Sequence, residues 1–197
     1  MARKAARSRA RRSPAARSAS SGPPRQRIVD AFMALLAEWP IERIGLAEIA
    51  ERAGVTLSEL RGEFSSPIAV LGGHVKELDR AVLAGADPDM AEESPREQLF
   101  DVLMRRLDLL APHREAVRSL LRSARRNPPL ALALNAMAVR SQQWMLTAAG
   151  ISASGPKGML RSQGLALLFA NVLRTWVDDD DNNTRTLAAL DQALARG

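Results

Sequence analysis

Two short amphipathic stretches of this 197-residue chain are joined across a single glycine, and they determine the fold of the region around them. The apolar residues of the first stretch share one helical face and are Leu46, Ile49, Ala50 and Ala53. Gly54 follows, where a glycine ends a helix in the left-handed conformation without steric cost. Thr56 or Ser58 is expected to cap the next helix. The residues that this second helix is expected to bury are Leu57, Leu60 and Phe64. Two helices joined by such a tight turn make a helix-turn-helix, whose second helix can enter the major groove of DNA.

The rest of the chain shows the same helical period and no convincing strand. The first helix carries an apolar stripe at Ile28, Phe32, Leu35, Leu36 and Trp39. Pro40 ends that helix, and further breaks fall at Pro112, 127–129, 150–156 and 178–183. The pattern predicts an all-α protein with nine helices, at about residues 25–39, 46–53, 57–64, 67–84, 95–111, 113–126, 129–148, 157–177 and 184–195.

The positive charge of the chain is concentrated at its N-terminal end. Residues 1–27 hold eight Arg, one Lys and no acid, so that the net charge of +6 leaves −3 for the other 170 residues. Residues 1–24 are therefore predicted to be a disordered basic tail that binds polyanions without sequence preference. The tail shares its Arg and Ser content with mitochondrial transit peptides but lacks the apolar residues of an amphipathic face. We expect a cytoplasmic location.

Few residues of the chain are candidates for chemistry. The absence of Cys excludes disulfides and thiolate metal sites. His74 and His113 stand without a nucleophile or partner motif, and the acidic run 178–181 lacks the alternating ligands and the glycine of a calcium loop. This run is expected to be a solvated helix end whose last Asp or Asn caps the next helix. We therefore expect no enzyme activity, no catalytic residue, no metal and no cofactor.

The string from Ile44 to Thr56, continued by Leu60 and Phe64, closely resembles the N-terminal domain of the TetR family of transcriptional repressors. The resemblance runs from about Arg25 to Leu71. It implies a nine-helix TetR-like fold, with a helix-turn-helix DNA-binding domain at 25–71 and a helical ligand-binding and dimerisation domain at 72–197. It also implies a repressor that binds a double-stranded DNA operator and responds to an apolar small molecule. The residues that it nominates for DNA contact are Arg25, Arg27, Ala47, Thr56, Leu57, Ser58 and Arg61.

Three positions depart from the usual pattern of that family. Arg61, Glu63 and Pro67 stand where Tyr, His and Lys are common. Between residues 25 and 75 five Arg oppose seven acidic residues, and this net −2 is poorly suited to a phosphate backbone. Arg61 could contact guanine through two hydrogen bonds, Thr56 and Ser58 could contact phosphate, and the basic tail could supply the missing attraction.

Helix 157–177 carries apolar residues on nearly every face, so it must be covered on all sides. A second copy of the chain, packed as a C₂ homodimer, is the natural cover. The residues expected at this interface are Leu165, Leu168, Val172, Trp176, Leu187 and Leu190. The positions at 130, 134, 137, 144 and 145 are expected to lie in the core, where some also line a ligand cavity. The residues proposed for that cavity are Leu103, Leu107, Leu134, Met137, Trp144 and Phe169.

The C-terminal half, from about residue 99 to 195, shows a second likeness. The segments 112–117, 149–150, 175–180 and 190–191, with Trp144 and Thr184, resemble the TetR-fold accessory lipid-binding proteins of ubiquinone biosynthesis. This likeness implies an alternative function, lipid binding without specific DNA binding. The longest apolar stretch, 165–173, is too short to cross a bilayer, so stable membrane insertion is not expected.

Overall fold

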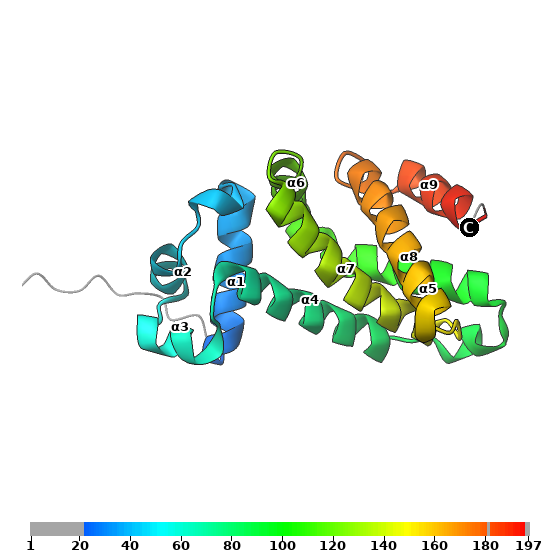
Figure 1. Cartoon of the computed structure of the whole chain (residues 1–197), viewed down its shortest axis with the longest axis horizontal. Helices are drawn as coiled ribbons and strands as arrows, with labels where there is room; N and C mark the ends of the chain where they lie inside the picture. The colour runs from blue at the N-terminus through cyan, green and yellow to red at the C-terminus, as the bar shows by residue number, and fades with distance from the viewer. Residues whose placement is uncertain (1–21, 181, 196–197) are drawn as a thin grey trace, which may run out of the picture.

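The computed structural model describes residues 22–180 and 182–195, and these residues form helices and no strand (Figure 1). The all-α class is therefore confirmed. The α-helices are α1 (Pro24–Glu38), α2 (Leu46–Ala53), α3 (Leu57–Glu63), α4 (Pro67–Ala84), α5 (Pro95–Leu110), α6 (Arg114–Ala124), α7 (Pro128–Ala148), α8 (Gly155–Trp176) and α9 (Thr184–Ala195). Three short 3₁₀ helices join them: η1 (Ile41–Arg43), η2 (Pro88–Glu92) and η3 (Ala111–His113). The predicted basic tail lies outside the described residues except for residues 22–24, and α1 already begins at Pro24.

The turn between α2 and α3 has the predicted glycine cap. Gly54 adopts φ 63° and ψ 35°, the left-handed conformation that costs a residue with a Cβ about 1–2 kcal/mol. The amide of Val55 donates to the carbonyl of Ala50 at 3.0 Å and closes the last turn of α2. Thr56 then caps α3 by accepting from the amide of Glu59 at 3.1 Å. The helix-turn-helix is confirmed as a structural element.

Two hydrophobic clusters fill the molecule. The first combines α1, η1, α2, α3 and the start of α4 with Ala116 and Leu120 of α6 and Leu130 of α7. The second combines residues of all six helices from α4 through α9, and Leu103, Leu107 and Trp176 are fully buried in it. The first cluster crosses the domain boundary predicted after residue 71, because α1 packs against α6 as well as against α2 and α3. The helix-turn-helix is thus seated on the body of the protein as well as joined to it through α4 (Figure 1).

Three residues expected in the core are largely exposed. Leu57 is 59% exposed because it is the first residue of α3, ahead of the face on which Leu60 and Phe64 are buried. Trp39 is 41% exposed because it follows the end of α1 in an extended conformation, directly before Pro40. Trp144 is 59% exposed on the outer face of α7.

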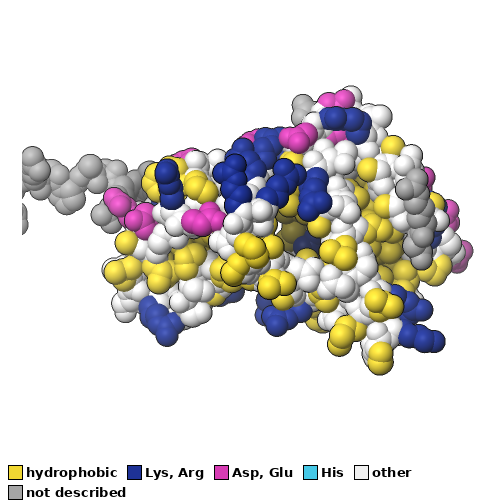
Figure 2. Space-filling model, turned by 45° about the horizontal axis from the view of Figure 1, so that its top comes forward, with side chains coloured by type: hydrophobic (Ala, Val, Ile, Leu, Met, Phe, Trp, Pro, Cys, Tyr) yellow, Lys and Arg dark blue, Asp and Glu magenta, His cyan; other side chains and the backbone are white. Residues whose placement is uncertain are grey.

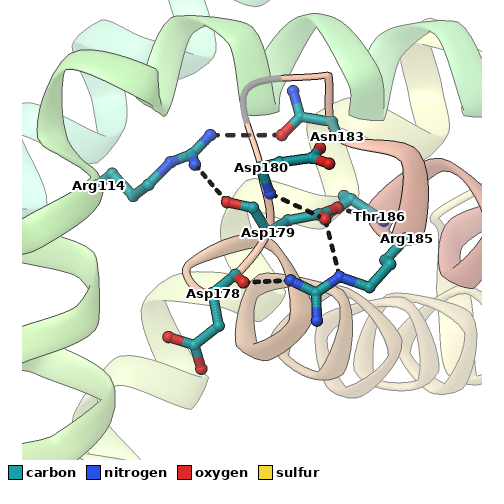
Figure 3. Close-up of polar contacts among 7 residues, drawn as sticks. All are labelled: Arg114, Asp178, Asp179, Asp180, Asn183, Arg185 and Thr186. Atoms are coloured by element: carbon teal, nitrogen blue, oxygen red, sulfur yellow. Dashed lines mark hydrogen bonds and ion pairs between the residues drawn. The ribbon is translucent and has the colours of Figure 1, made fainter.

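In the acidic run after α8, Asp178 and Asp180 are exposed as predicted, but Asp179 is not. The side chain of Asp179 is fully buried and accepts hydrogen bonds from the amides of Asp180 and Thr186, the hydroxyl of Thr186 and the guanidinium of Arg185 (Figure 3). Burial alone would raise the pKa of Asp179, but the bonds from Thr186, Arg185 and Asp180 together hold that pKa well below its ordinary value. Arg114 of α6 also donates to the Asp179 carbonyl at 3.0 Å. Asp179 thus fixes the corner between α8 and α9, while Asp181 lies outside the described residues.

The two histidines lie together where α4 meets η3. The rings of His74 and His113 meet edge to face, with their centroids 4.8 Å apart. Burial, reinforced by His113 and Arg106, lowers the pKa of His74 to about 4. His74 is therefore a neutral packing residue near pH 7.

Candidate functional site

The outer surface of the helix-turn-helix is formed by the start of α2 and the exposed face of α3. Ala47, Leu57 and Ser58 are exposed there, together with Arg61. Arg61 forms no ion pair or side-chain hydrogen bond with any described residue, whereas Leu60 is buried beneath it and anchors the helix. The surface therefore offers one cation, one hydroxyl and an apolar side chain to a partner.

Thr56 and Glu59 are bound to each other in a reciprocal cap. Glu59 accepts from the amide of Thr56 at 2.7 Å and from its hydroxyl at 2.8 Å. These two bonds lower the pKa of Glu59 and keep it ionised, and the bond from the amide has the larger effect. Glu59 is exposed and fixes the start of α3. The Thr56 hydroxyl, a candidate phosphate contact, is already in use in this cap.

Arg25 and Arg27 hold the unit together from within. The guanidinium of Arg25 lies 4.5 Å from the centroid of the Phe64 ring and pairs with Glu63 at 3.3 Å and Glu77 at 3.5 Å. On its other side the Phe64 ring lies against Gly73 of α4, where an added Cβ would come within 2.8 Å of the ring. Arg27 donates at 3.3 Å to the carbonyls of Ala53 and Gly54 at the end of α2. Both arginines were nominated for DNA contact, and the structure shows them half-buried in contacts within the chain.

The acidic residues of this unit are mostly engaged in contacts of their own. Glu38 accepts hydrogen bonds from both terminal nitrogens of Arg52, each at 2.8 Å. Glu48 accepts from the amide of Gly45 at 3.1 Å and caps α2, as Glu59 caps α3. Glu63 is paired with Arg25. These contacts fix the positions of the carboxylates but leave the net charge of −2 unchanged, because Arg25 and Arg52 are already counted in it.

The six residues nominated for a ligand cavity are not brought together. Leu103, Leu107 and Phe169 are buried against one another in the second cluster, and Leu134 packs on the first. Only Met137 and Trp144 line a described hollow. It is a groove of about 450 Å³ between α4 and α7, and its other lining residues are Gly72, Val75, Lys76, Asp79, Arg80, Leu83, Arg140 and Ser141.

A buried charged network forms the floor of this groove. Asp79 of α4 pairs with Arg106 of α5 and accepts from the hydroxyl of Ser141 of α7 at 2.7 Å. Arg106 is only 5% exposed and lies over the ring of Phe169, with 5.8 Å between guanidinium carbon and ring centroid. The exposed cations of the groove are Lys76, Arg80 and Arg140. The network ties three helices together directly beneath a cationic rim.

The dimer residues are also placed differently from the expectation. Leu165, Val172, Trp176 and Leu190 are at most 6% exposed and belong to the core of one protomer, while Leu168 is half-buried. The physical reason is that α5, α7 and α9 already cover that side of α8. The apolar residues that α8 and α9 leave exposed are Met159, Leu160, Leu167 and Leu187, of which only the last was nominated.

Several candidate residues were missed by reasoning from the sequence. Trp39 was assigned to an apolar stripe, although Pro40 directly after it indicates that the helix ends there. Arg122 and Arg126 were not singled out from the sequence. The cations Lys76, Arg80 and Arg140 belong to α4 and α7, which the sequence alone could not pair. Within the described residues, no group of three or more His, Asp or Glu side chains is placed to bind a metal, and no helix is long and apolar enough to span a bilayer.

The comparisons with known proteins give a consistent fold. No protein-family model matches the chain, and no curated protein matches its sequence. Among solved structures, a TetR transcriptional regulator from Nitrosomonas europaea matches with a TM-score of 0.69 and 23% identity over 89% of this chain and 98% of its own. A TetR regulator from Rhodococcus sp. RHA1 matches with a TM-score of 0.62 and 22% identity over 88% of this chain and 94% of its own.

A third solved structure is the transcriptional regulator FadR from Bacillus subtilis in complex with stearoyl-CoA. It matches with a TM-score of 0.52 and 18% identity over 86% of this chain and 95% of its own. Each of these likenesses spans both the helix-turn-helix and the helical body. The chain folds as a TetR-family transcriptional regulator does.

Proposed function

We propose that the protein is a DNA-binding transcriptional regulator, a ligand-responsive repressor that inserts α3 into the major groove of an operator. The observation that carries this proposal is the outer surface of the helix-turn-helix. α3 is capped at its start and anchored by Leu60 and Phe64, and it leaves Ser58 and Arg61 exposed. A short rigid helix that presents a hydroxyl and an unpaired guanidinium is suited to contact phosphate and the edge of guanine.

Replacing Arg61 with Ala is expected to weaken binding to the operator by about 1–3 kcal/mol, because Arg61 is the cation that α3 presents without a partner in the chain. Binding to unrelated DNA should change far less. A mobility-shift assay with the upstream region of the protein's own gene measures both. Arg140→Ala is the matched control, since Arg140 is also exposed and unpaired among the described residues but lies on α7.

The same assay with and without residues 1–24 separates reading of a sequence from general attraction. Specific regulation predicts that the body retains its preference for the operator when the tail is removed, although its affinity falls. If binding needs the tail and any sequence competes equally well, α3 does not read an operator.

We further propose that the active form is a homodimer built on the outer face of α8 and α9. Leu160 and Leu167 are 74% and 56% exposed and share one face of α8 with Gly164, whose Cβ position has no neighbour within 4 Å. An apolar stripe interrupted by a glycine allows a second α8 to approach closely. Such a dimer would set two α3 helices about one DNA turn apart, roughly 34–36 Å.

The double change Leu160→Glu and Leu167→Glu is expected to give a monomer, because two carboxylates on each face would be buried against those of the partner. Sedimentation velocity measures the change in mass. Leu57→Glu is the control, because Leu57 is 59% exposed on α3, outside α8 and α9. An unchanged dimer in the double variant would place the interface elsewhere.

For the effector we propose an apolar molecule with an anionic group, held in the groove between α4 and α7. Met137, Leu83 and Trp144 supply apolar wall, and Lys76, Arg80 and Arg140 supply positive charge. α4 leads directly into the helix-turn-helix, so a ligand that binds one position of α4 better than another shifts the reading head. The Bacillus subtilis regulator's ligand, stearoyl-CoA, has this combination of an apolar chain and an anionic group.

A second candidate is a lipid-binding protein that does not read DNA. Leu57 favours it, because this large apolar side chain is 59% exposed where a reading helix would meet DNA. Mass spectrometry of organic extracts of the purified protein tests this candidate. An isoprenoid or phospholipid in stoichiometric amount, together with failure of the operator assay, would favour lipid binding.

A further inference from the structure

A second hollow lies where the helix-turn-helix unit meets the body, on the opposite side of α1 from α2. It has a volume of about 630 Å³, within the range of small-molecule sites. One wall is the end of α1 and the start of η1, and the other is the end of α6 with the turn into α7. The lining residues are Glu38, Trp39, Pro40, Glu42, Ser119, Arg122, Ser123, Arg126, Asn127 and Pro128. We call it the junction cleft.

The acidic groups of the junction cleft are already bound by the chain. Glu38 is held by both terminal nitrogens of Arg52. Glu42 accepts from the hydroxyl of Ser123 at 2.9 Å and from the amide nitrogen of Asn127 at 3.4 Å. Glu42 therefore ties the two walls together, whereas Glu38 is paired with Arg52 of α2, outside the cleft.

The cations of the junction cleft have no such partners. Arg122 and Arg126 are exposed and make no ion pair or side-chain hydrogen bond within the part of the chain that the structure describes. One turn earlier on α6, Arg118 is paired with both Glu115 and Asp178. Figure 2 shows Lys and Arg side chains gathered on this face, over the region where the two parts meet. Two guanidinium groups thus line one cleft without an ion-pair partner among the described residues, together with the carboxylate of Glu42.

The apolar part of the lining consists of one indole ring and two proline rings. The indole of Trp39 is 41% exposed, and its backbone is fixed because its carbonyl accepts from Ser119 of α6 at 3.2 Å. Pro40 and Pro128 stand on the two walls. An exposed indole can stack on planar rings, and guanidinium groups bind phosphate through paired hydrogen bonds.

From this combination we propose that the junction cleft binds a nucleoside phosphate, with its base on Trp39 and its phosphates on Arg122 and Arg126. The site is separate from both the surface of α3 and the groove between α4 and α7. A ligand there contacts α1 and α6 at once and so stabilises the seating of the helix-turn-helix on the body.

The full-length protein is titrated with ADP, with inorganic pyrophosphate and with adenosine, and binding is followed by tryptophan fluorescence and calorimetry. We expect ADP to bind and quench the fluorescence, and pyrophosphate and adenosine to bind about tenfold or more weakly, since each lacks half of the contacts. The double change Arg122→Ala and Arg126→Ala should weaken ADP binding about tenfold or more. Trp39→Leu should weaken it too, while Trp39→Phe keeps a ring and most of the affinity.

The matched control is the double change Lys157→Ala and Arg161→Ala, which removes the same charge from an exposed part of α8. It should leave ADP binding unchanged, and the basic tail is present in every variant. Equal affinity for pyrophosphate and ADP, equal loss in both double variants, or no binding of ADP would overturn the proposal. So would duplex DNA binding that needs Arg122 and Arg126 in a protein that does not bind ADP, since the cleft would then serve nucleic acid. Circular dichroism verifies that each variant is folded.

Discussion

Replacing Asp79 with Ala is expected to lower the free energy of unfolding by about 3–5 kcal/mol, as is typical when one partner of a buried ion pair is removed. Arg106 would remain charged at 5% exposure, with only the sulfur of Met145 and the face of Phe169 near its guanidinium. The hydroxyl of Ser141 would lose its acceptor as well. Domains of this kind are stable by only about 5–15 kcal/mol in total, so the loss is measurable by urea unfolding.

Two further variants separate a buried charge from a general loss of packing. Asp191→Ala removes an exposed ion pair, between Arg96 of α5 and Asp191 of α9, and should cost less than about 1 kcal/mol. The double change Asp79→Leu and Arg106→Met removes both charges and should recover most of the stability. If the double variant is as unstable as Asp79→Ala, the unpaired Arg106 is not the cause.

Trp176→Ala is expected to cost about 3–5 kcal/mol, the usual range for removing a large aromatic side chain from a core. Trp176 is fully buried at the end of α8, and the guanidinium of Arg114 lies 4.9 Å from its ring centroid. The cavity would open at the junction of α6, α8 and α9, next to the corner that Asp179 fixes. Thermal unfolding followed by circular dichroism measures the loss.

The chain contains its own control for this change. Trp144 is 59% exposed on α7, so Trp144→Ala should cost less than about 1 kcal/mol. Trp176→Phe should be much milder than Trp176→Ala, because the indole nitrogen makes no hydrogen bond in the described part of the chain and the ring volume is largely kept. Equal losses of stability from the two Trp→Ala changes would mean that burial of Trp176 does not stabilise the core.

The helices could be predicted from the sequence because their signals are local. α2 begins and ends at Leu46 and Ala53 as predicted, since its apolar period and Gly54 lie within a few residues of each other. Burial could be predicted less well. Leu57 and Trp39 have helical spacing with core residues, but each stands at a helix end, where the chain changes direction.

Pairings between distant segments could not be read from the sequence. The spacing of apolar residues on α8 showed that every face is apolar, but not which face the protomer itself covers. Leu165 and Trp176 face inwards, whereas Leu160 and Leu167 face out. The partnership of Asp79 with Arg106 and the junction cleft at Trp39 and Arg122 likewise join segments that only the fold brings together.

Because α1 belongs to the first hydrophobic cluster together with α6 and α7, the helix-turn-helix of this protein is not a detachable module. Excising residues 22–71 would strip the buried face of α1 from Ala116 and Leu120 and expose it to water. Transferring the helix-turn-helix to another protein would require changes in the recipient's counterpart of α6, so that its residues pack against α1. The outer surface of α3 is therefore best altered by exchanging single residues, while the contact between α1 and α6 stays intact.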